Sequence, residues 1–354
     1  MEFRRIENLP PYVFSIINGL KIEARRAGAD VVDLGFGNPD IPSPQIAVDK
    51  LAEAARNPKN HRYSLSRGLP KLREAIAGYY KAKWDVDLDT ELEITNTIGS
   101  KEGFSHLMWV LLDRGDAAIV PSPSYPIHIY GPLFAGADLR QVPMKFLADP
   151  DQREHFADDF MDSLQTAWDV GWPKPRVLVI SFPHNPTGAT VDLAFMQRVV
   201  DFCREHEMIV VHDFAYADVG FDGHQPPSIL QAEGAKECAV ELYSMTKSFS
   251  MAGWRSAFLL GNAEVVQALV KLKSYLDYGM FQPVQIAATV TINEAADDPN
   301  EIRSIYESRC DTLIDGLGRI GWDIPKPGGS MFVWAPIPEP YTEMDSVEFC
   351  SLIV

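Results

Sequence analysis

The sequence predicts an α/β fold, in which a mainly parallel β-sheet is covered by helices on both faces and is followed by a smaller α+β domain. Three observations support this prediction. Apolar, β-branched runs alternate with helical periods from about residue 46 to about residue 265. Each run ends in a turn of Gly, Pro, Asn or Ser, which is typical of strands in such sheets. After about residue 265 the pattern changes to long helical segments.

The first expected element is an amphipathic helix near the N-terminus. Val13, Ile16, Ile17 and Leu20 follow helical spacing after two prolines. We expect the residues before this helix to form a short extended arm that can reach a second subunit.

Six apolar runs are expected to form the strands of the sheet. They are residues 92–97, 117–122, 177–182, 208–213, 239–244 and 257–261. A further strand, in the smaller domain, is expected within residues 326–337, because Met331, Val333 and Ala335 alternate with other residues. The predicted domain boundaries are an N-terminal arm and part of the small domain at 1–45, a large domain at 46–285, and a small domain at 286–354.

The charge and cysteine content exclude several classes of protein. The chain has 32 Lys and Arg against 49 Asp and Glu, a net charge of −17, which disfavours nucleic-acid binding. The four cysteines are far apart without a C-x-x-C pair, so we expect no disulfides and no zinc site, and a cytoplasmic location. No apolar stretch is long enough to span a membrane.

A metal hydrolase is also disfavoured. The pairs His206-Glu207 and His212-Asp213 offer ligand types, but no H-E-x-x-H spacing supports them. We therefore expect no metal site.

Polar residues follow several of the predicted strands, where ligands bind in parallel sheets. Gly99 opens a helix after the first run, and Asn185 lies in HNPTG after the third. Asp213 ends the fourth run, and Lys247 follows the fifth. Taken singly, each has a structural explanation: an ordinary turn, a helix N-cap or a solvated lysine.

Together these residues suit one ligand. Free N–H groups in the helix turn at 99–101 favour a phosphate. A desolvated Lys247 beside Arg255 has a lowered pKa and reacts with a carbonyl as a Schiff-base nucleophile. A buried carboxylate at Asp213 needs a cation or donor, such as a protonated ring nitrogen. We therefore expect pyridoxal 5′-phosphate to be the cofactor.

The segment SMTKSFSMAGWRSA resembles the lysine signature of the class I/II (fold type I) pyridoxal-phosphate aminotransferases. Ser256 departs from that pattern, since an aliphatic residue is more usual there. The resemblance covers essentially the whole chain. The segments GNPD, YSLSRGLPKLREAI, TIGSKEG, PSPSYPIHIYG, VHDFAYAD and KSYLDYG are most similar to the bacterial alanine (glutamate–pyruvate) aminotransferase branch, near the LL-diaminopimelate and aspartate aminotransferases.

The resemblance implies a role for each matching residue. Lys247 forms the covalent link to the cofactor and moves the proton, and Asp213 pairs with the ring nitrogen. Asn185 and Tyr216 bind the ring 3′ oxygen, and Tyr125 stacks on the ring. The phosphate is held by Gly99, Ser100, Lys101, Ser244 and Arg255.

The resemblance also implies a homodimer with shared active sites. Tyr63 reaches the phosphate of the neighbouring subunit, Gly37 offers its backbone to the substrate carboxylate, and Asn185 also binds the substrate. The family binds that carboxylate with a late arginine, and the sequence ends at Val354 before such a strand is expected, so we expect an incomplete small domain.

The expected reaction is amino transfer by a ping-pong mechanism, with L-alanine and 2-oxoglutarate as the preferred pair. LL-diaminopimelate or aspartate aminotransferase activity is the alternative within the family. A β-lyase acting on sulfur amino acids uses the same residues. A non-catalytic relative that only binds the cofactor is the alternative from another class.

Overall fold

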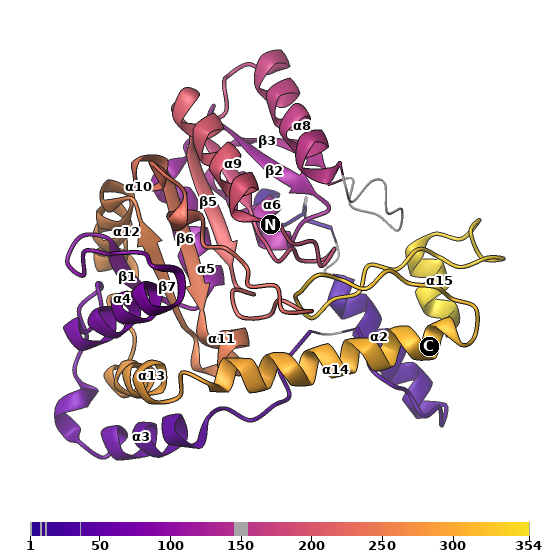
Figure 1. The fold of residues 1–354 in the computed structure, drawn as a ribbon, viewed down its shortest axis with the longest axis horizontal. Helices are drawn as coiled ribbons and strands as arrows, with labels where there is room; N and C mark the ends of the chain where they lie inside the picture. Colours follow the sequence, from indigo (N-terminus) through magenta and orange to yellow (C-terminus); the bar gives the residue numbers. More distant parts are fainter. Residues whose placement is uncertain (1, 8, 11–12, 36, 145–154, 354) are drawn as a thin grey trace.

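The computed structural model describes residues 2–7, 9–10, 13–35, 37–144 and 155–353. A seven-stranded sheet forms its centre, in the order β1-β7-β6-β5-β4-β2-β3 (Figure 1). The strands are β1 (Ile94–Ile98), β2 (Ala117–Ser122), β3 (Asp138–Pro143), β4 (Val177–Ile180), β5 (Ile209–Phe214), β6 (Ala239–Ser244) and β7 (Ser256–Gly261). β7 is antiparallel to both of its neighbours, and the other pairs are parallel, which confirms the mainly parallel sheet.

All six strands predicted from apolar runs are present, and the seventh, β3, was missed. β3 lies at the edge of the sheet, and of its six residues only Val142 is buried. An edge strand with one covered position needs no continuous apolar run. Its sequence, DLRQVP, therefore gives no strand signal of the kind that identified the others.

Helices cover both faces of the sheet, as Figure 1 shows. Successive residues of a strand point to opposite faces, so Ile119 and Val210 pack in one apolar cluster, and Val120 and Val211 pack in another. The first cluster includes α4 (Pro70–Trp84), α8 (Phe156–Val170) and α9 (Leu193–Glu205). The second includes α5 (Ser100–Leu111), α6 (Pro126–Ala135) and α12 (Ala263–Leu276).

The other helices connect and extend this core. They are α1 (Arg4–Glu7), α2 (Val13–Arg26), α3 (Gln45–Ala55), α10 (Ala235–Cys238), α11 (Met245–Ser248), α13 (Gln282–Glu294), α14 (Asp298–Gly318) and α15 (Ser346–Ile353), with short 3-10 turns at Pro58–His61, Ile229–Gln231 and Ala252–Trp254. In Figure 1, α14 runs from beside α11 towards α15 and the C-terminus. A third apolar cluster, including Tyr216, Phe221, Ile302 and Tyr306, packs α14 against the segment that follows β5.

Two expectations about the ends of the chain were wrong. No strand forms within residues 326–337, where the only ladder contact is an isolated bridge between Gly220 and Gly329. A strand needs a continuous ladder of backbone hydrogen bonds. Within this segment, the described bonds to the chain after β5 run from Phe221 N to Gly328 O at 2.9 Å and from Ser330 N to Val219 O at 2.8 Å, and the ladder does not continue. The predicted extended arm contains the one-turn helix α1, whereas the helix predicted from Val13 onward is confirmed as α2.

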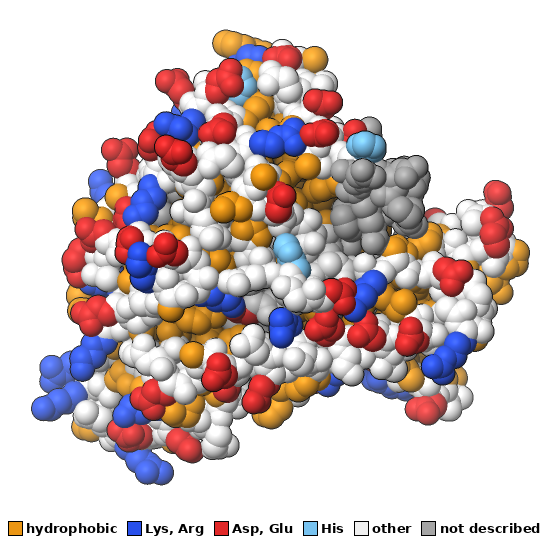
Figure 2. Space-filling view, in the orientation of Figure 1, with side chains coloured by type: hydrophobic (Ala, Val, Ile, Leu, Met, Phe, Trp, Pro, Cys, Tyr) orange, Lys and Arg blue, Asp and Glu red, His pale blue; other side chains and the backbone are white. Residues whose placement is uncertain are grey.

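Several properties of the surface and of the thiols follow directly. Figure 2 shows Asp and Glu side chains spread over the visible face, in keeping with the net charge of −17. All four cysteines are free. Across the described part of the chain, no helix combines the length and apolar character needed to cross a bilayer. The domain boundaries at residues 45 and 285 stay a prediction.

Candidate active site

The carboxyl ends of four strands bring the predicted site residues to one edge of the sheet. Gly99 follows β1, Asn185 lies in the loop after β4, Asp213 is near the end of β5, and Ser244 ends β6. The register pairs Ile180 with His212 and Asp213 with Leu242, so the ends of β4, β5 and β6 are level. This edge is where ligands bind in open α/β sheets.

Asp213 has one carboxylate oxygen in a hydrogen bond and one without a partner. Its Oδ2 accepts from His128 Nε2 at 2.8 Å, and His128 Nδ1 lies 3.0 Å from Ser124 Oγ. Its main-chain carbonyl accepts from Ser181 Oγ at 2.9 Å. Oδ1 is buried and has no hydrogen-bond partner among the described residues. Such an oxygen is costly to bury unless a donor from a ligand meets it.

Sequence reasoning missed His128. It lies in PSPSYPIHIYG on α6, 85 positions from Asp213 along the chain, and no spacing rule connects the two. A carboxylate only accepts hydrogen bonds, so Nε2 carries the proton. His128 therefore fixes the orientation of the Asp213 carboxylate, and Ser124 holds the far side of the imidazole.

Lys247 projects from α11 towards the same region. Its Nζ donates to the Gly37 carbonyl oxygen at 2.8 Å and lies 5.9 Å from the centre of the Tyr216 ring. Burial lowers the pKa of Lys247 to about 8, which agrees with the predicted desolvation. Arg255 was expected to contribute to this shift, but it is exposed, and burial alone accounts for the lowered pKa.

Gly99 and Arg255 form a close pair at the start of α5. Gly99 has φ +79°, and a Cβ atom at this position would overlap the Arg255 guanidinium. Arg255 itself adopts a left-handed conformation with φ +57° and donates to the Ala252 carbonyl at 3.1 Å. The guanidinium therefore lies beside the free N–H groups of the α5 N-terminus, an arrangement suited to an anion such as a phosphate.

The other predicted cofactor residues surround this region. Ser244 caps α11, its Oγ accepting from Thr246 N at 3.2 Å. Ser100 and Lys101 form the first turn of α5, and Lys101 Nζ lies 5.7 Å from the centre of the Tyr125 ring. The Tyr125 ring in turn contacts His128 edge-on, at 5.7 Å between centroids.

Asn185 and Tyr216 complete the group, and Tyr63 lies apart from it. Asn185 is half-buried. Tyr216 is buried, and burial together with the charge of Asp213 raises the pKa of its hydroxyl well above 10. Tyr63 is 88% exposed and packs against Tyr278, with 5.2 Å between ring centroids. The structure thus brings all of the predicted cofactor residues except Tyr63 to the carboxyl ends of the strands.

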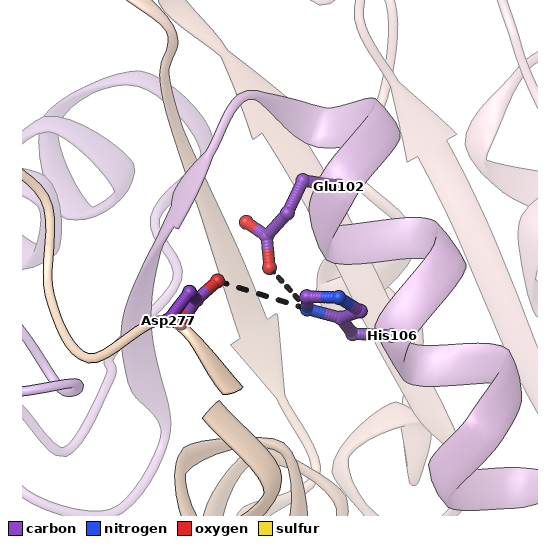
Figure 3. A group of neighbouring side chains, drawn as sticks. All are labelled: Glu102, His106 and Asp277. Carbon is purple, nitrogen blue, oxygen red and sulfur yellow. Dashed lines mark ion pairs between the residues drawn. The ribbon is translucent and has the colours of Figure 1, made fainter. Parts of the chain in front are cut away.

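A second polar cluster is formed by two residues of the first turns of α5 and by the residue that follows α12. Figure 3 shows Glu102, His106 and Asp277, whose ligand-type atoms lie within 4.8 Å of one another. The buried Lys273 ammonium donates to both Glu102 Oε1 and Asp277 Oδ2 at 2.9 Å, so a cation of the chain already bridges the two carboxylates. Burial opposes ionisation, but His106 and Lys273 lower the pKa of Glu102 to about 2. Because Glu102 Oε2 accepts from Ile98 N at 2.6 Å, the cluster anchors the turn at Gly99.

Comparison with known proteins gives one consistent result. The family model for aminotransferase class I and II matches residues 29–351. The glutamate–pyruvate aminotransferase AlaC of Escherichia coli strain K12 is 46% identical over 99% of this chain and 83% of its own length. The LL-diaminopimelate aminotransferase of Moorella thermoacetica is 40% identical over 98% of this chain and 86% of its length.

Solved structures agree with the sequence matches. The apo-BacF structure from Bacillus subtilis superposes with a TM-score of 0.86 and 35% identity, covering 99% of this chain and 86% of that one. The sheet order and the helices on its two faces are therefore those of a known α/β architecture.

Proposed function

The chain belongs to the class I and II aminotransferases, enzymes that depend on pyridoxal 5′-phosphate, and on this premise we propose that it moves the amino group of L-alanine to 2-oxoglutarate, giving pyruvate and L-glutamate. The buried, unpartnered Oδ1 of Asp213, at the same sheet edge as Lys247, carries the assignment of the site. The substrate pair is supported by the 46% identity to a glutamate–pyruvate aminotransferase.

The residues at the sheet edge fit the cofactor. Asp213 Oδ1 lacks the donor that a protonated ring nitrogen supplies, and the start of α5 with Arg255 suits the phosphate. When bound, pyridoxal phosphate supplies an aldehyde for exchange of the amino group and a ring that delocalises the electrons left at the substrate Cα. We assign the phosphate to Gly99, Ser100, Lys101, Ser244 and Arg255, and the ring to Tyr125, Asn185, Asp213 and Tyr216.

Lys247 performs the proton transfer in this proposal. With a pKa of about 8, a substantial fraction of its amine is neutral near pH 7 to 8, so it can accept the proton from the substrate Cα. An ordinary exposed lysine has a pKa of 10.5, so it is almost wholly protonated at this pH and is a poor base. With the cofactor bound, the Lys247 ammonium formed in this way would act as the acid that gives the proton back, which would leave the amine neutral again.

Asp213, oriented by His128, would keep the ring nitrogen of a bound cofactor protonated. The negative charge of Asp213 favours a positive ring nitrogen. Because His128 donates to Oδ2, the second oxygen is directed to the ligand instead of rotating away. We place the substrate carboxylate near Gly37 and Asn185.

We further propose a homodimer with shared active sites. Tyr63, Leu65, Tyr275 and Tyr278 are large side chains, each more than half exposed, and Tyr63 packs on Tyr278. Exposed apolar groups gathered in this way are typical of protein interfaces. Tyr63 would then reach the partner's phosphate. The four free thiols suit a reducing compartment, and we propose that the enzyme is located in the cytoplasm.

The test is the half-reaction without an oxo acid. The purified protein, loaded with pyridoxal phosphate, is mixed in turn with L-alanine, L-glutamate, L-aspartate and LL-diaminopimelate, and the absorbance of the bound cofactor is followed. Conversion to the amine form by alanine and glutamate, with pyruvate released from alanine, supports the proposal.

Two other outcomes contradict it. Conversion by LL-diaminopimelate but not by alanine moves the enzyme to the other named group of relatives. Continuous release of ammonia with pyruvate from a sulfur amino acid, without any acceptor, identifies a β-lyase.

A further inference from the structure

A hollow of about 450 Å³ lies between α4, α14 and the segment that follows β5. It is formed by α4 residues around Lys83, by residues within segment 217–226, by Ala296 and by the first part of α14. None of the residues that line it belongs to the cofactor site described above. The hollow is large enough for a small organic molecule.

Arg303, on α14, brings an unbalanced charge to this hollow. No carboxylate or other acceptor in the described part of the chain bonds to its guanidinium, and its Nε is buried without a partner. Asp218, the carboxylate among the residues that line the hollow, already has partners: it accepts from Tyr79 Oη and Tyr243 Oη, each at 2.9 Å, and pairs with Lys83. A buried donor without a partner, on a side chain that carries an unbalanced charge, can be satisfied by an anionic ligand.

The pKa of Lys83 also indicates an excess of positive charge at the hollow. Burial, and then the like charge of Arg303, lower its pKa to about 8. Asp218 is therefore not enough to balance both cations. The residues that line the hollow therefore carry one excess positive charge, from Lys83 and Arg303 against Asp218, in a protein whose net charge is −17.

A second donor and an apolar wall define the ligand further. His224 also lines the hollow, and its Nε2 is buried without a partner among the described residues. Burial lowers the pKa of His224, so the ring is neutral near pH 7 and can still donate one N–H. The rest of the wall is partly apolar, including Ala217, Pro226, Ala296 and Pro299.

We propose that this hollow binds the carboxylate of a small organic acid. The planar guanidinium of Arg303 matches a carboxylate in geometry, and the single excess charge matches a monoanion. An inorganic dianion would leave the apolar wall unused and would lie close to Asp218. A bound carboxylate contacts both α14 and the segment after Tyr216, so it stabilises the folded protein.

The experiment uses the enzyme loaded with pyridoxal phosphate and the probe sodium propionate, which carries no amino or oxo group. Binding is measured by saturation-transfer NMR at constant ionic strength set with sodium chloride. Arg303→Gln removes the free guanidinium. Arg319→Gln, an exposed arginine just after the same helix, removes the same charge elsewhere and is the matched control. Turnover and the absorbance of the bound cofactor show that each variant is folded.

We expect propionate to bind with a dissociation constant of about 1 mM, the range of a weak small-ligand site. Arg303→Gln should weaken it at least tenfold, and Arg319→Gln less than twofold. Ala296→Phe, which fills the hollow without changing charge, should weaken it similarly and covers the case in which Arg303→Gln does not fold. Equal affinity in wild type, Arg303→Gln and Ala296→Phe overturns the proposal, and so does inorganic phosphate competing as well as propionate. Neither result depends on which amino acid the enzyme uses.

Discussion

His212 and Asp213 are consecutive residues of β5 on opposite faces of the sheet, and they differ in whether the buried polar atoms around them all have hydrogen-bond partners. His212 Nδ1 lies 2.8 Å from Glu241 Oε2, and Glu241 Oε1 accepts from Tyr80 Oη at 2.7 Å and Ser228 Oγ at 2.8 Å. Every polar atom of this buried network has a partner. On the other face, Asp213 keeps Oδ1 buried and unpartnered.

The difference separates two uses of a buried carboxylate. Glu241 is wholly buried, and its four contacts, the fourth from Ile229 N at 3.0 Å, all come from the chain itself. A complete network of this kind supports folding and leaves nothing for a ligand. The incomplete one at Asp213 reserves an acceptor for a group that the chain does not supply.

The largest effect is expected at the Asp213 face from Lys247→Ala. Loss of the amine removes both the covalent attachment and the proton carrier, so turnover should fall by about 10⁴-fold or more. The measurement is steady-state amino transfer, with the exposed Lys271→Ala as the control. A variant that kept a tenth of the wild-type rate would contradict the assignment of Lys247.

Asp213→Asn comes next. The amide cannot balance a positive ring nitrogen, so turnover should fall by about 10²- to 10³-fold, the usual size of a lost electrostatic contact at a reacting centre. Chemical denaturation of the cofactor-free protein should show a change below about 1 kcal/mol, because Oδ1 has no partner to lose. A large loss of stability with normal turnover would make Asp213 part of the folding network instead.

Glu241→Gln should show the reverse pattern. Removing the charge opposite His212 breaks a wholly buried pair, which typically costs about 3 kcal/mol of unfolding free energy. Turnover per folded molecule should stay within a few-fold of wild type, because this network faces away from the site. Urea denaturation and activity at saturating cofactor measure the two quantities, and a fall in activity at unchanged stability would break the comparison.

The last expected effect is a pH dependence of stability in the cofactor-free enzyme. The folded pKa of Lys247 is about 8 against 10.5 for an ordinary lysine, so the unfolded chain binds more protons between these values. The stability of the wild type should therefore rise, relative to Lys247→Ala, as the pH increases from about 8 to 10.5. Denaturation midpoints at pH 7, 9 and 10.5 test this, and parallel profiles for the two proteins would show that Lys247 is not desolvated.

Much of the sheet could be predicted from the sequence, because central strands are buried on both faces. All four residues of VLVI in β4 are buried, so the strand is a continuous apolar run that the sequence reveals. The β3 sequence DLRQVP lies at the edge of the sheet and is mostly exposed, so it contains no such run. The strand expected around Val333 does not form, although its sequence does carry a strand signal. Alternation shows that a segment suits a strand, but hydrogen bonds to a neighbour decide whether one forms.

The site was predicted from motif order, and its geometry was not. Residues next to a strand end, such as Lys247 and Asp213, could be placed because parallel strands end together. His128 could not, because it meets Asp213 through the packing of α6 on the sheet. The sequence also did not reveal that Arg255 is exposed. We therefore expected its charge to help lower the pKa of Lys247, whereas burial alone lowers it.

The most direct test of the central claim compares the affinity of the cofactor-free enzyme for pyridoxal phosphate and for its 1-deaza analogue, in which carbon replaces the ring nitrogen. If Asp213 Oδ1 receives the ring N–H, the wild type should prefer the natural cofactor by at least about tenfold, the value of one charge-assisted hydrogen bond. Asp213→Ala should lose most of that preference. Equal affinities in the wild type, or an unchanged preference in Asp213→Ala, would contradict the claim that the unpartnered oxygen is reserved for the cofactor.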